Sequence, residues 1–360
     1  MVEGLCGDGR GALRDCAMRA VVYQQTGPSS VLEVVERDLP VPGPGEVRVR
    51  VVRAGVNPTD WKFRAGMMTE YDEVVPGQDG AGVVDAVGEG VDGLAVGDRV
   101  WLVLAQAGRA YGTAAELTVQ PAARVVPLPA DASFDLGASL GVPAVTAHRA
   151  LTAAEGGPSR LWPGALEGRV VLVAGGAGAV GNAAIQLARW AGATVVTTVS
   201  SAEKAALARA AGADHVVNYR EPGAAQAILE TAPDGVDLAV EVAPAQNIEL
   251  DLDVVRVHGT VSIYANNGGD TLTMPLRAAF GKNLRFQFLI LYTLREDLLR
   301  AAVEDISVAL AAGALRVGEE AGLPLHHYPL AQAAEAHDAV EGGVVGKVLL
   351  DVGSAADRDL

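Results

Sequence analysis

The residues with the clearest chemical pattern are three glycines within RVVLVAGGAGAVG, residues 169–181. Gly176, Gly178 and Gly181 follow a β-branched apolar run and precede NAAIQLARWA, whose apolar residues have helical spacing. We expect Gly176 to permit a tight turn, Gly178 to admit a pyrophosphate, and Gly181 to let the helix pack on the strand. The phosphates would bind N–H groups at the start of the helix, those of Ala179, Val180 and Gly181. The segment predicts a dinucleotide site.

The end of the second strand, VVTTVSSAEK, predicts which dinucleotide binds. An NAD site usually has an acidic residue about 20 residues after the glycines. Here Ser200 and Ser201 stand at the strand end, followed by Lys204. Hydroxyls and an ammonium bind a 2′-phosphate, which a carboxylate would repel, so we expect NADPH. A second interpretation is that Ser200 and Glu203 form a helix capping box with Lys204 in solvent, and the two interpretations are compatible.

Composition limits the class of protein. A chain of 360 residues is too long for one core, which predicts two domains. The 28 basic and 44 acidic residues give a formal charge of −16, which argues against nucleic acid or an anionic membrane as partner. The sequence has neither a signal-peptide core nor an apolar run of membrane-spanning length, so we expect a cytoplasmic protein.

The first 17 residues form a glycine-rich leader that holds both cysteines, Cys6 and Cys16. We interpret these as reduced thiols in a mobile leader, with a disulfide between them as the alternative. A strand pattern begins at Met18, and the sequence leaves open whether translation starts at Met1 or Met18.

Two patterns of secondary structure follow along the chain, one rich in strands and one with alternating strands and helices. Short apolar runs bounded by Gly, Pro and Asp predict a small barrel or sandwich, and they are residues 31–36, 46–54, 80–87, 98–103 and 115–119. After two helices at 135–140 and 144–153, interrupted at Gly141-Val142-Pro143, strands alternate with helices, as in a parallel doubly wound sheet. The predicted strands are residues 169–174, 193–199, 215–217, 238–242 and 259–264, and the helices between them are 202–211 and 224–231. A helix at 295–312, a strand at 322–324, a helix at 330–339 and a strand at 346–352 end the chain.

The chain resembles the medium-chain dehydrogenase/reductase superfamily, in particular its zinc-free quinone oxidoreductase (zeta-crystallin-like) branch. The matching segments are MRAVVYQ, PGPGEVRVRVVRAGVNPTDW, VPGQDGAGVVDAVGEGVDGLAVGDRVW, VLVAGGAGAVGNAAIQLAR, GADHVVNY and GKVLL. The resemblance implies an α/β fold, with a Rossmann doubly wound parallel sheet inserted into a β-rich GroES-like domain. The expected parts are a leader at 1–17, the GroES-like domain at 18–142, the Rossmann domain at 143–288 and a return to the first domain at 289–360. The resemblance also implies an active site in the cleft between the domains, and homodimers formed through the Rossmann domains.

The resemblance also bears on metal. Zinc-dependent relatives carry Cys where this chain has Asn57, His-Glu where it has Gln78-Asp79, and a cysteine quartet that this chain lacks. Catalytic zinc needs about three ligands, mainly Cys and His, so we expect a metal-free site. Without a Lewis acid, hydride acceptors must delocalise the incoming charge themselves. The expected substrates are therefore quinones and α,β-unsaturated carbonyls.

Three residues are candidates for catalysis. Asn57 would donate an amide N–H to the oxygen that gains charge, or position the nicotinamide ribose; alternatively it is only an Asn-Pro turn residue. Lys62 would donate a proton or bind an acidic substrate, unless it is a solvated lysine on a short helix. By resemblance Thr146 contacts nicotinamide or substrate, with helix packing as the alternative. Relatives often have tyrosines shortly after the asparagine, where this chain has Trp61, Lys62 and Phe63.

The remaining cofactor residues follow from the same resemblance. Tyr219 matches a tyrosine beside the 2′-phosphate. Gly346-Lys347 would close over the cofactor, with a solvated Lys347 as the alternative. We assign two further strand ends to that site, at Val242 and Tyr264. The sequence thus predicts an NADPH-dependent reductase of quinones or enones. The alternatives are an enoyl-thioester or secondary-metabolite double-bond reductase and a non-catalytic, crystallin-like NADPH-binding protein.

Overall fold

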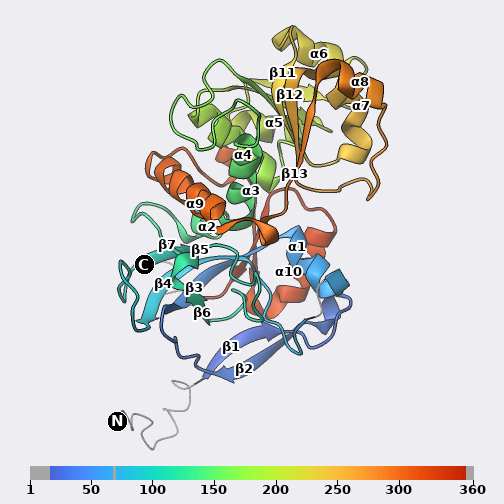
Figure 1. Cartoon of the computed structure of the whole chain (residues 1–360). Coiled ribbons are helices and arrows are strands. Elements are labelled where there is room, and N and C mark those ends of the chain that lie inside the picture. The colour runs from blue at the N-terminus through green and yellow to red at the C-terminus, as the bar shows by residue number, and fades with distance from the viewer. Residues whose placement is uncertain (1–16, 68–69, 354–360) are drawn as a thin grey trace, which may run out of the picture. The chain divides into compact units, whose positions relative to one another are not determined.

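The computed structural model describes residues 17–67 and 70–353, and the chain forms two compact units (Figure 1). The first unit runs through Gly141 and takes up the chain again at residues 326–344 and from 348 onward; the second holds residues 142–325 and 345–347. A doubly wound parallel sheet is thus inserted into a β-rich unit, which confirms the predicted fold class. Cys6 and Cys16 lie outside the described residues.

The first unit is built on a seven-stranded sheet with the order β14-β15-β3-β4-β5-β7 and with β6 pairing β3. β3 (Glu46–Val56) is its central strand, and β4 (Asp79–Val87) pairs antiparallel along one edge. The other edge is shared, because β6 (Leu117–Pro121) pairs residues 46–50 and β15 (Lys347–Asp351) pairs residues 53–56. The last strand of the chain is therefore needed to cover β3. The other strands of this sheet are β5 (Arg99–Leu102), β7 (Val125–Pro127) and β14 (Leu325–Pro329).

A second layer of the first unit combines an early and a late segment of the described chain. β1 (Ala17–Val22) pairs antiparallel with β2 (Glu33–Asp38), which follows a short 3-10 turn at Ser29–Val31, where the prediction had strand from residue 31. α10 (Ala333–Glu341) buries Ala336 in one apolar cluster with Val21, Val51 and Leu350. The unit also contains two short helices, α1 (Pro58–Lys62) and α2 (Phe134–Gly137).

The second unit is a six-stranded parallel sheet with the order β10-β9-β8-β11-β12-β13. Its strands are β8 (Val170–Ala174), β9 (Thr194–Val199), β10 (His215–Asn218), β11 (Val236–Glu241), β12 (Val255–Ile263) and β13 (Arg285–Phe288). The strand order reverses between β8 and β11, and in open parallel sheets ligands bind at such a switch point, outside the carboxyl ends of the strands.

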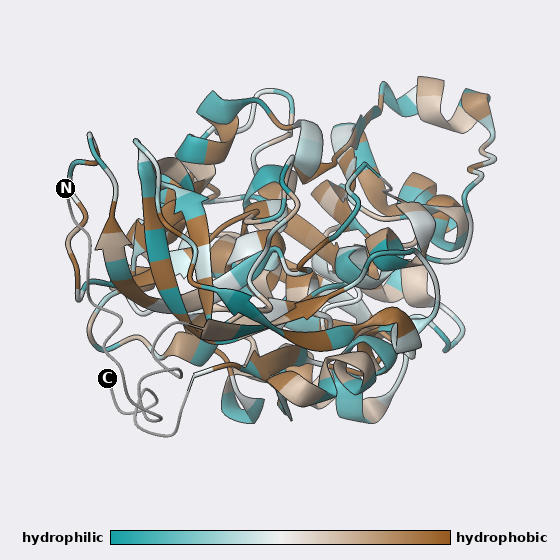
Figure 2. Cartoon of the chain, turned by 90° about the horizontal axis from the view of Figure 1, so that it is seen from below, coloured by the Kyte–Doolittle hydropathy of each residue, from teal (hydrophilic) through white to brown (hydrophobic). Residues whose placement is uncertain are grey.

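The helices of the second unit are α3 (Gly141–Leu151, whose first residue closes the first unit), α4 (Ala179–Trp190), α5 (Ala202–Ala210), α6 (Ala224–Thr231), α7 (Pro244–Val254), α8 (Leu276–Lys282) and α9 (Glu296–Ala311). Several of these helices, among them α4, α6 and α9, are amphipathic, and Figure 2 shows helices banded in teal and brown. In the part of the chain described here, no helix has both the length and the apolar character needed to cross a bilayer.

Several elements differ from the sequence prediction. α3 runs through Gly141-Val142-Pro143, so the predicted interruption is wrong. Pro143 lies in the first turn, where a helix needs no N–H donor. The prediction lacks α7, whose alternating Asn, Glu and Asp residues include poor helix formers. It also lacks α8 and β13.

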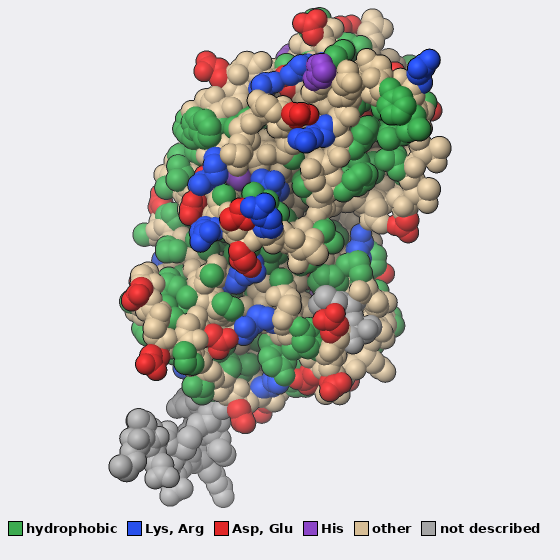
Figure 3. Space-filling view, viewed as in Figure 1, with side chains coloured by type: hydrophobic (Ala, Val, Ile, Leu, Met, Phe, Trp, Pro, Cys, Tyr) green, Lys and Arg blue, Asp and Glu red, His purple; other side chains and the backbone are tan. Residues whose placement is uncertain are grey.

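The outer strand of the second unit has an apolar surface. β13 pairs only with β12 in the described sheet, so its other edge is open. Phe288 on this strand, Ile290 after it, and Leu276 and Phe280 on α8 are exposed. Figure 3 shows hydrophobic side chains gathered over α8, at the upper right. An open strand edge beside exposed apolar residues is a surface suited to pairing with another chain.

A buried ion network holds α9 in the second unit. Asp305 on α9 lies 2.8 Å from His148 Nε2 on α3 and 2.6 Å from Arg160 Nη2, and it accepts the N–H of Leu161 at 2.7 Å. Burial alone would raise the pKa of Asp305, but these hydrogen bonds lower it to about 2. Residues 289–325 therefore belong to the second unit, and the return to the first comes at His326, later than the predicted residue 289.

Replacing Asp305 by Ala should lower the free energy of unfolding by about 3 kcal/mol, since it leaves buried donors without their charged acceptor. Urea denaturation at pH 7 measures this. Because the folded pKa lies below the ordinary 3.8, the contribution is present above pH 4 and disappears as the pH falls toward 2. The control is Glu304→Ala, whose pair with Arg160 is exposed and should be worth under about 1 kcal/mol. Equal losses in the two variants would contradict the assignment.

Candidate active site

The glycine turn lies between β8 and α4, at the switch point of the sheet. Gly175 has a φ of +71°, so the left-handed position of the turn belongs to this residue and not to Gly176 as predicted. Gly176 is required for another reason, because a Cβ there would lie 2.1 Å from Thr197 Oγ1 on β9. A Cβ on Gly181 would lie 2.4 Å from the oxygen of Gly175, so α4 starts against the turn as expected.

The start of α4 fits a pyrophosphate. Gly178 is the N-cap and uses no side-chain cap, and a Cβ there would meet only the oxygen of Gly175, at 3.5 Å. The N–H groups that open a helix have no acceptor within it, which here concerns Ala179, Val180 and Gly181. Val242, just after β11, flanks the turn, since its Cγ1 lies 3.3 Å from the position of a Cβ on Gly175. The residues present therefore fit the diphosphate of a dinucleotide.

The next two strand ends bring the predicted 2′-phosphate residues near each other. The N–H of Tyr219 donates to the oxygen of Val199 at 3.1 Å, so the residue after β10 lies beside the end of β9, next to Ser200. Tyr219 is exposed, and Lys204 is partly exposed on the first turn of α5. Arg220, which follows Tyr219, is also exposed and was not predicted; a basic residue after the strand pattern VVNY was the available signal.

A helix cap is present at this position as well, but one residue later than predicted. Ser201 is the N-cap of α5, and its Oγ accepts the N–H of Lys204 at 3.3 Å. Its hydroxyl also donates to Glu203 at 3.2 Å. The capping interpretation therefore applies to Ser201, whereas Ser200 lies before the cap.

Tyr264 lies beside an acidic group that the sequence reasoning missed. The N–H of Tyr264 donates to the oxygen of Glu241 at 3.1 Å, which joins the ends of β12 and β11. The Glu241 carboxylate accepts from Asn247 at 3.0 Å and from the N–H of Ala243, and so anchors the turn into α7. Burial raises the pKa of Glu241, and burial together with Glu241 raises the pKa of Tyr264.

A second buried acid accompanies Glu241. Among the described residues, neither carboxyl oxygen of Asp251 on α7 has a hydrogen-bond partner. Burial, followed by the charge of Glu241, raises the pKa of Asp251 well above its ordinary value. The sequence signal for the pair was an acid at the end of the apolar strand LAVE.

In the first unit, Asn57 is held at the start of α1 by two acidic residues. It is the N-cap of this helix, and its backbone N–H donates to Asp60 Oδ2 at 2.7 Å. Its side-chain Nδ2 donates to Asp79 Oδ2 at 2.8 Å, and all three residues are buried. The register of β3 and β4, which pairs Gly55 with Asp79, brings these groups together. Asn57 is therefore a turn residue at the start of α1, and its side-chain amide is in addition fixed by a buried carboxylate.

The other predicted residues are divided between the units. Lys62 lies on α1 of the first unit, partly exposed, with its Nζ 5.9 Å from the ring centroid of Trp61. Thr146 is buried on α3 of the second unit. Lys347 is only 1% exposed, so the alternative of a solvated lysine is wrong.

The three positions that carry zinc ligands in metal-dependent relatives hold two amides and one carboxylate. Asn57 and Asp79 bind each other. Gln78, which precedes Asp79 in the sequence, is also buried. Within residues 17–67 and 70–353, no group of three or more His, Cys, Asp and Glu side chains is arranged so that it could hold a metal ion. This donor set does not fit the ligand requirements of catalytic zinc.

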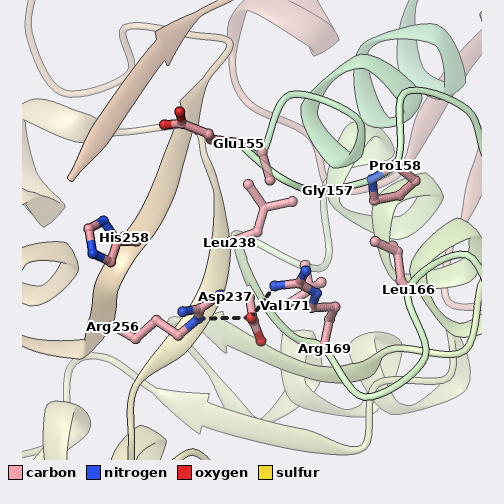
Figure 4. Close-up of a pocket in the computed structure, with 11 residues that line it drawn as sticks. Glu155, Gly157, Pro158, Leu166, Arg169, Val171, Asp237, Leu238, Arg256 and His258 are labelled. Atoms are coloured by element: carbon pink, nitrogen blue, oxygen red, sulfur yellow. Dashed lines mark hydrogen bonds and ion pairs between the residues drawn. The ribbon is translucent and has the colours of Figure 1, made fainter. Parts of the chain in front are cut away.

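A small cavity lies at the opposite, amino end of the parallel strands and plays no part in this site. Figure 4 shows Arg169 and Arg256 both reaching Asp237 there, at 2.9 and 2.8 Å. The cavity holds about 10 Å³, room for no more than one water. This ion pair network stabilises the strand starts and leaves the carboxyl ends for the dinucleotide.

Comparisons with known proteins agree with this geometry. Residues 43–130 match the alcohol dehydrogenase GroES-like domain, and residues 179–307 match the zinc-binding dehydrogenase family. The quinone oxidoreductase of Rattus norvegicus is 30% identical over 342 residues, 92% of this chain and 97% of the relative. The 2-haloacrylate reductase of a Burkholderia species is also 30% identical, over 92% of this chain and 98% of its own.

Solved structures of related proteins also match the fold of this chain. A mycobacterial protein complexed with NADPH superposes with a TM-score of 0.77 at 30% identity, covering 92% of this chain and 99% of its own. Sequence, fold and the glycine turn agree, and the chain belongs to the quinone oxidoreductase family within the medium-chain dehydrogenase/reductase superfamily.

Proposed function

We propose that the protein is an NADPH-dependent oxidoreductase that transfers hydride to a quinone or an α,β-unsaturated carbonyl without a metal ion. The observation that carries this proposal is the buried hydrogen bond between Asn57 and Asp79. It occupies the positions that hold zinc in metal-dependent relatives and leaves a neutral amide in place of a Lewis acid. Acceptors that spread the incoming charge over a conjugated system need the least additional stabilisation.

Each group at the carboxyl edge of the parallel sheet has a role in binding the dinucleotide. When bound, NADPH supplies the hydride. The N-terminus of α4 would bind the pyrophosphate, because its N–H groups and dipole attract negative charge. Ser200, Ser201, Lys204 and Tyr219 would bind the 2′-phosphate. The residues proposed to flank the nicotinamide end are Val242, Tyr264, Thr146 and Lys347.

The first unit would handle the substrate. A quinone that accepts one hydride and one solvent proton becomes a hydroquinone, so no further oxidant or reductant is required. Negative charge develops on a substrate oxygen between these two events, and a fixed amide donor stabilises it most when its own orientation is already set. Asp79 sets the orientation of Asn57, and Lys62 is the proposed source of a proton or a contact for an acidic substrate.

A second candidate function is reduction of a carbon–carbon double bond next to a carboxyl or thioester. The relative named 2-haloacrylate reductase favours it. The same residues would serve this reaction, because the charge again develops on the conjugated carbonyl oxygen. The two functions differ only in the acceptor.

We also propose that the protein is a homodimer formed through the second unit. The open edge of β13 and the exposed Leu276, Phe280 and Phe288 offer a strand for pairing and an apolar surface to bury. This pairing would continue the parallel sheet of one copy into that of the other.

A panel of acceptors tests the reaction. NADPH consumption should be fastest with quinones and enones, slower with enoyl thioesters and absent with simple ketones, because only conjugated acceptors delocalise the charge. A chelator should leave each rate unchanged. A rate lost on chelation would contradict the metal-free proposal, and tight NADPH binding without turnover on any acceptor would indicate a binding protein.

Lys204→Ala tests the choice of cofactor. Loss of the ammonium should raise the Kd for NADPH about tenfold and leave the Kd for NADH unchanged, because only NADPH carries the 2′-phosphate. Fluorescence titration of both cofactors measures this. Arg209→Ala, an exposed residue near the other end of α5, is the control and should alter neither value. Equal weakening of NADPH and NADH by Lys204→Ala would contradict the assignment.

Phe288→Glu tests the dimer. A buried charge on the edge strand should convert the dimer into monomers, as measured by analytical ultracentrifugation. Val41→Glu adds the same charge at an exposed apolar residue of the first unit and should leave the mass unchanged. A Phe288→Glu protein that stays dimeric would show that another surface forms the interface.

A further inference from the structure

Gln78 occupies a rigid position directly before Asp79. Its backbone oxygen accepts the N–H of Ala105 at 2.9 Å. The oxygens of its two neighbours are also held, Gly77 by the N–H of Thr113 at 3.2 Å and Asp79 by Thr113 Oγ1 at 2.6 Å. Three successive carbonyl groups are therefore fixed by hydrogen bonds. The backbone from which the Gln78 side chain extends is thus fixed, which is one requirement for a group that binds a reacting atom.

The amide of Gln78 is buried without a partner. The residue is 0% exposed, and neither its Nε2 nor its Oε1 has a hydrogen-bond partner among the described residues. Gln120 on β6 is equally buried, but its Nε2 donates to Thr118 Oγ1 at 2.8 Å and to the oxygen of Tyr111 at 3.2 Å. Burying an unmatched amide costs free energy, and such a group in a native structure is a candidate for binding a ligand.

The neighbouring amide, that of Asn57, already has a hydrogen-bond partner within the first unit. Asn57 uses its Nδ2 to bind Asp79 and its backbone N–H to bind Asp60. Gln78 precedes Asp79 in the chain, so its amide leaves the backbone one residue from the carboxylate that fixes Asn57. Of these two amides, Gln78 is the one with both a donor and an acceptor unmatched in the described residues.

We infer that Gln78 is a substrate-binding residue, with Nε2 donating to the carbonyl oxygen that gains negative charge and Oε1 accepting a hydrogen bond from the reduced product. The inference rests on the proposed function and makes its substrate class more specific. A quinone carbonyl becomes a hydroxyl on reduction, so it uses the donor first and the acceptor afterwards. A saturated thioester has no hydroxyl to donate. The side chain therefore favours quinones over enoyl thioesters.

Gln78→Met tests this, with Gln120→Met as the matched control. Methionine has nearly the same length but no polar atom. For Gln78→Met we expect kcat/KM with naphthoquinone to fall about 100-fold, because an amide donor to the developing charge is lost. The Kd for NADPH should stay unchanged and Tm should stay equal or rise, because an unmatched polar group has been removed. Gln120→Met should lower Tm, because its hydrogen bonds are lost, and leave kcat/KM unchanged.

A binding measurement complements the kinetics. Calorimetry with hydroquinone in the presence of NADP⁺ should show weaker binding to Gln78→Met than to the wild type and to Gln120→Met. A Gln78→Met protein with wild-type kcat/KM and wild-type hydroquinone binding would overturn the inference, as would one that loses Tm together with activity, since Gln78 would then be structural. The wild-type rate is measured first, and a wild type that reduces no quinone would contradict the proposed function itself. The Gln78 variants then test only the role of this side chain, so the two failures are distinguishable.

Discussion

A fully buried carboxylate at Asp79 constrains the first unit. A charge out of contact with water must be paired or hydrogen-bonded, and here the side-chain amide of Asn57 supplies a donor at 2.8 Å. The neighbourhood is tight, since a Cβ on Gly141 would lie 2.2 Å from Asp79 Oδ1, so that residue must be glycine. The position of the β3–α1 turn, and with it the amide of Asn57, thus follows from the need to accommodate one buried acid.

In the second unit the constraint is close packing around the glycine turn. Gly176 must lack a side chain because of Thr197, and Gly181 because of the oxygen of Gly175. These contacts lie where the sheet order reverses, so the start of α4 points into the crevice that ligands use in open parallel sheets. The cations Lys204 and Arg220 border the neighbouring strand ends. A chain with a formal charge of −16 can bind an anionic dinucleotide only through such local groups.

The sequence pattern predicted the strongly periodic helices and strands well. It predicted poorly the features that depend on backbone angles or on contacts between distant residues. Residues 224–231 form α6 as predicted, and β8, β9 and β10 lie within a residue of their predicted bounds, since buried parallel strands are short apolar runs. The roles of Gly175 and Gly176 could not be separated without φ and the position of Thr197. Asp305 binds His148, 157 residues earlier in the chain, and no local pattern reveals such a pair. Gln78 is visible as a candidate only once the partners of every neighbouring amide are known.

In the proposed reaction, amides take the place of a metal ion, and this difference would set the chemistry of the site. A zinc ion would bring positive charge to the developing oxyanion, whereas an amide brings only a dipole, and the nearby Asp79 carboxylate opposes further negative charge. The hydrogen bond from Asn57 offsets part of this opposition by binding the carboxylate. An acceptor that is neutral and spreads its charge over a ring is therefore better matched to this site than an acid, whose own carboxylate would add to the repulsion. In the proposed reaction the buried acid would therefore favour neutral conjugated acceptors.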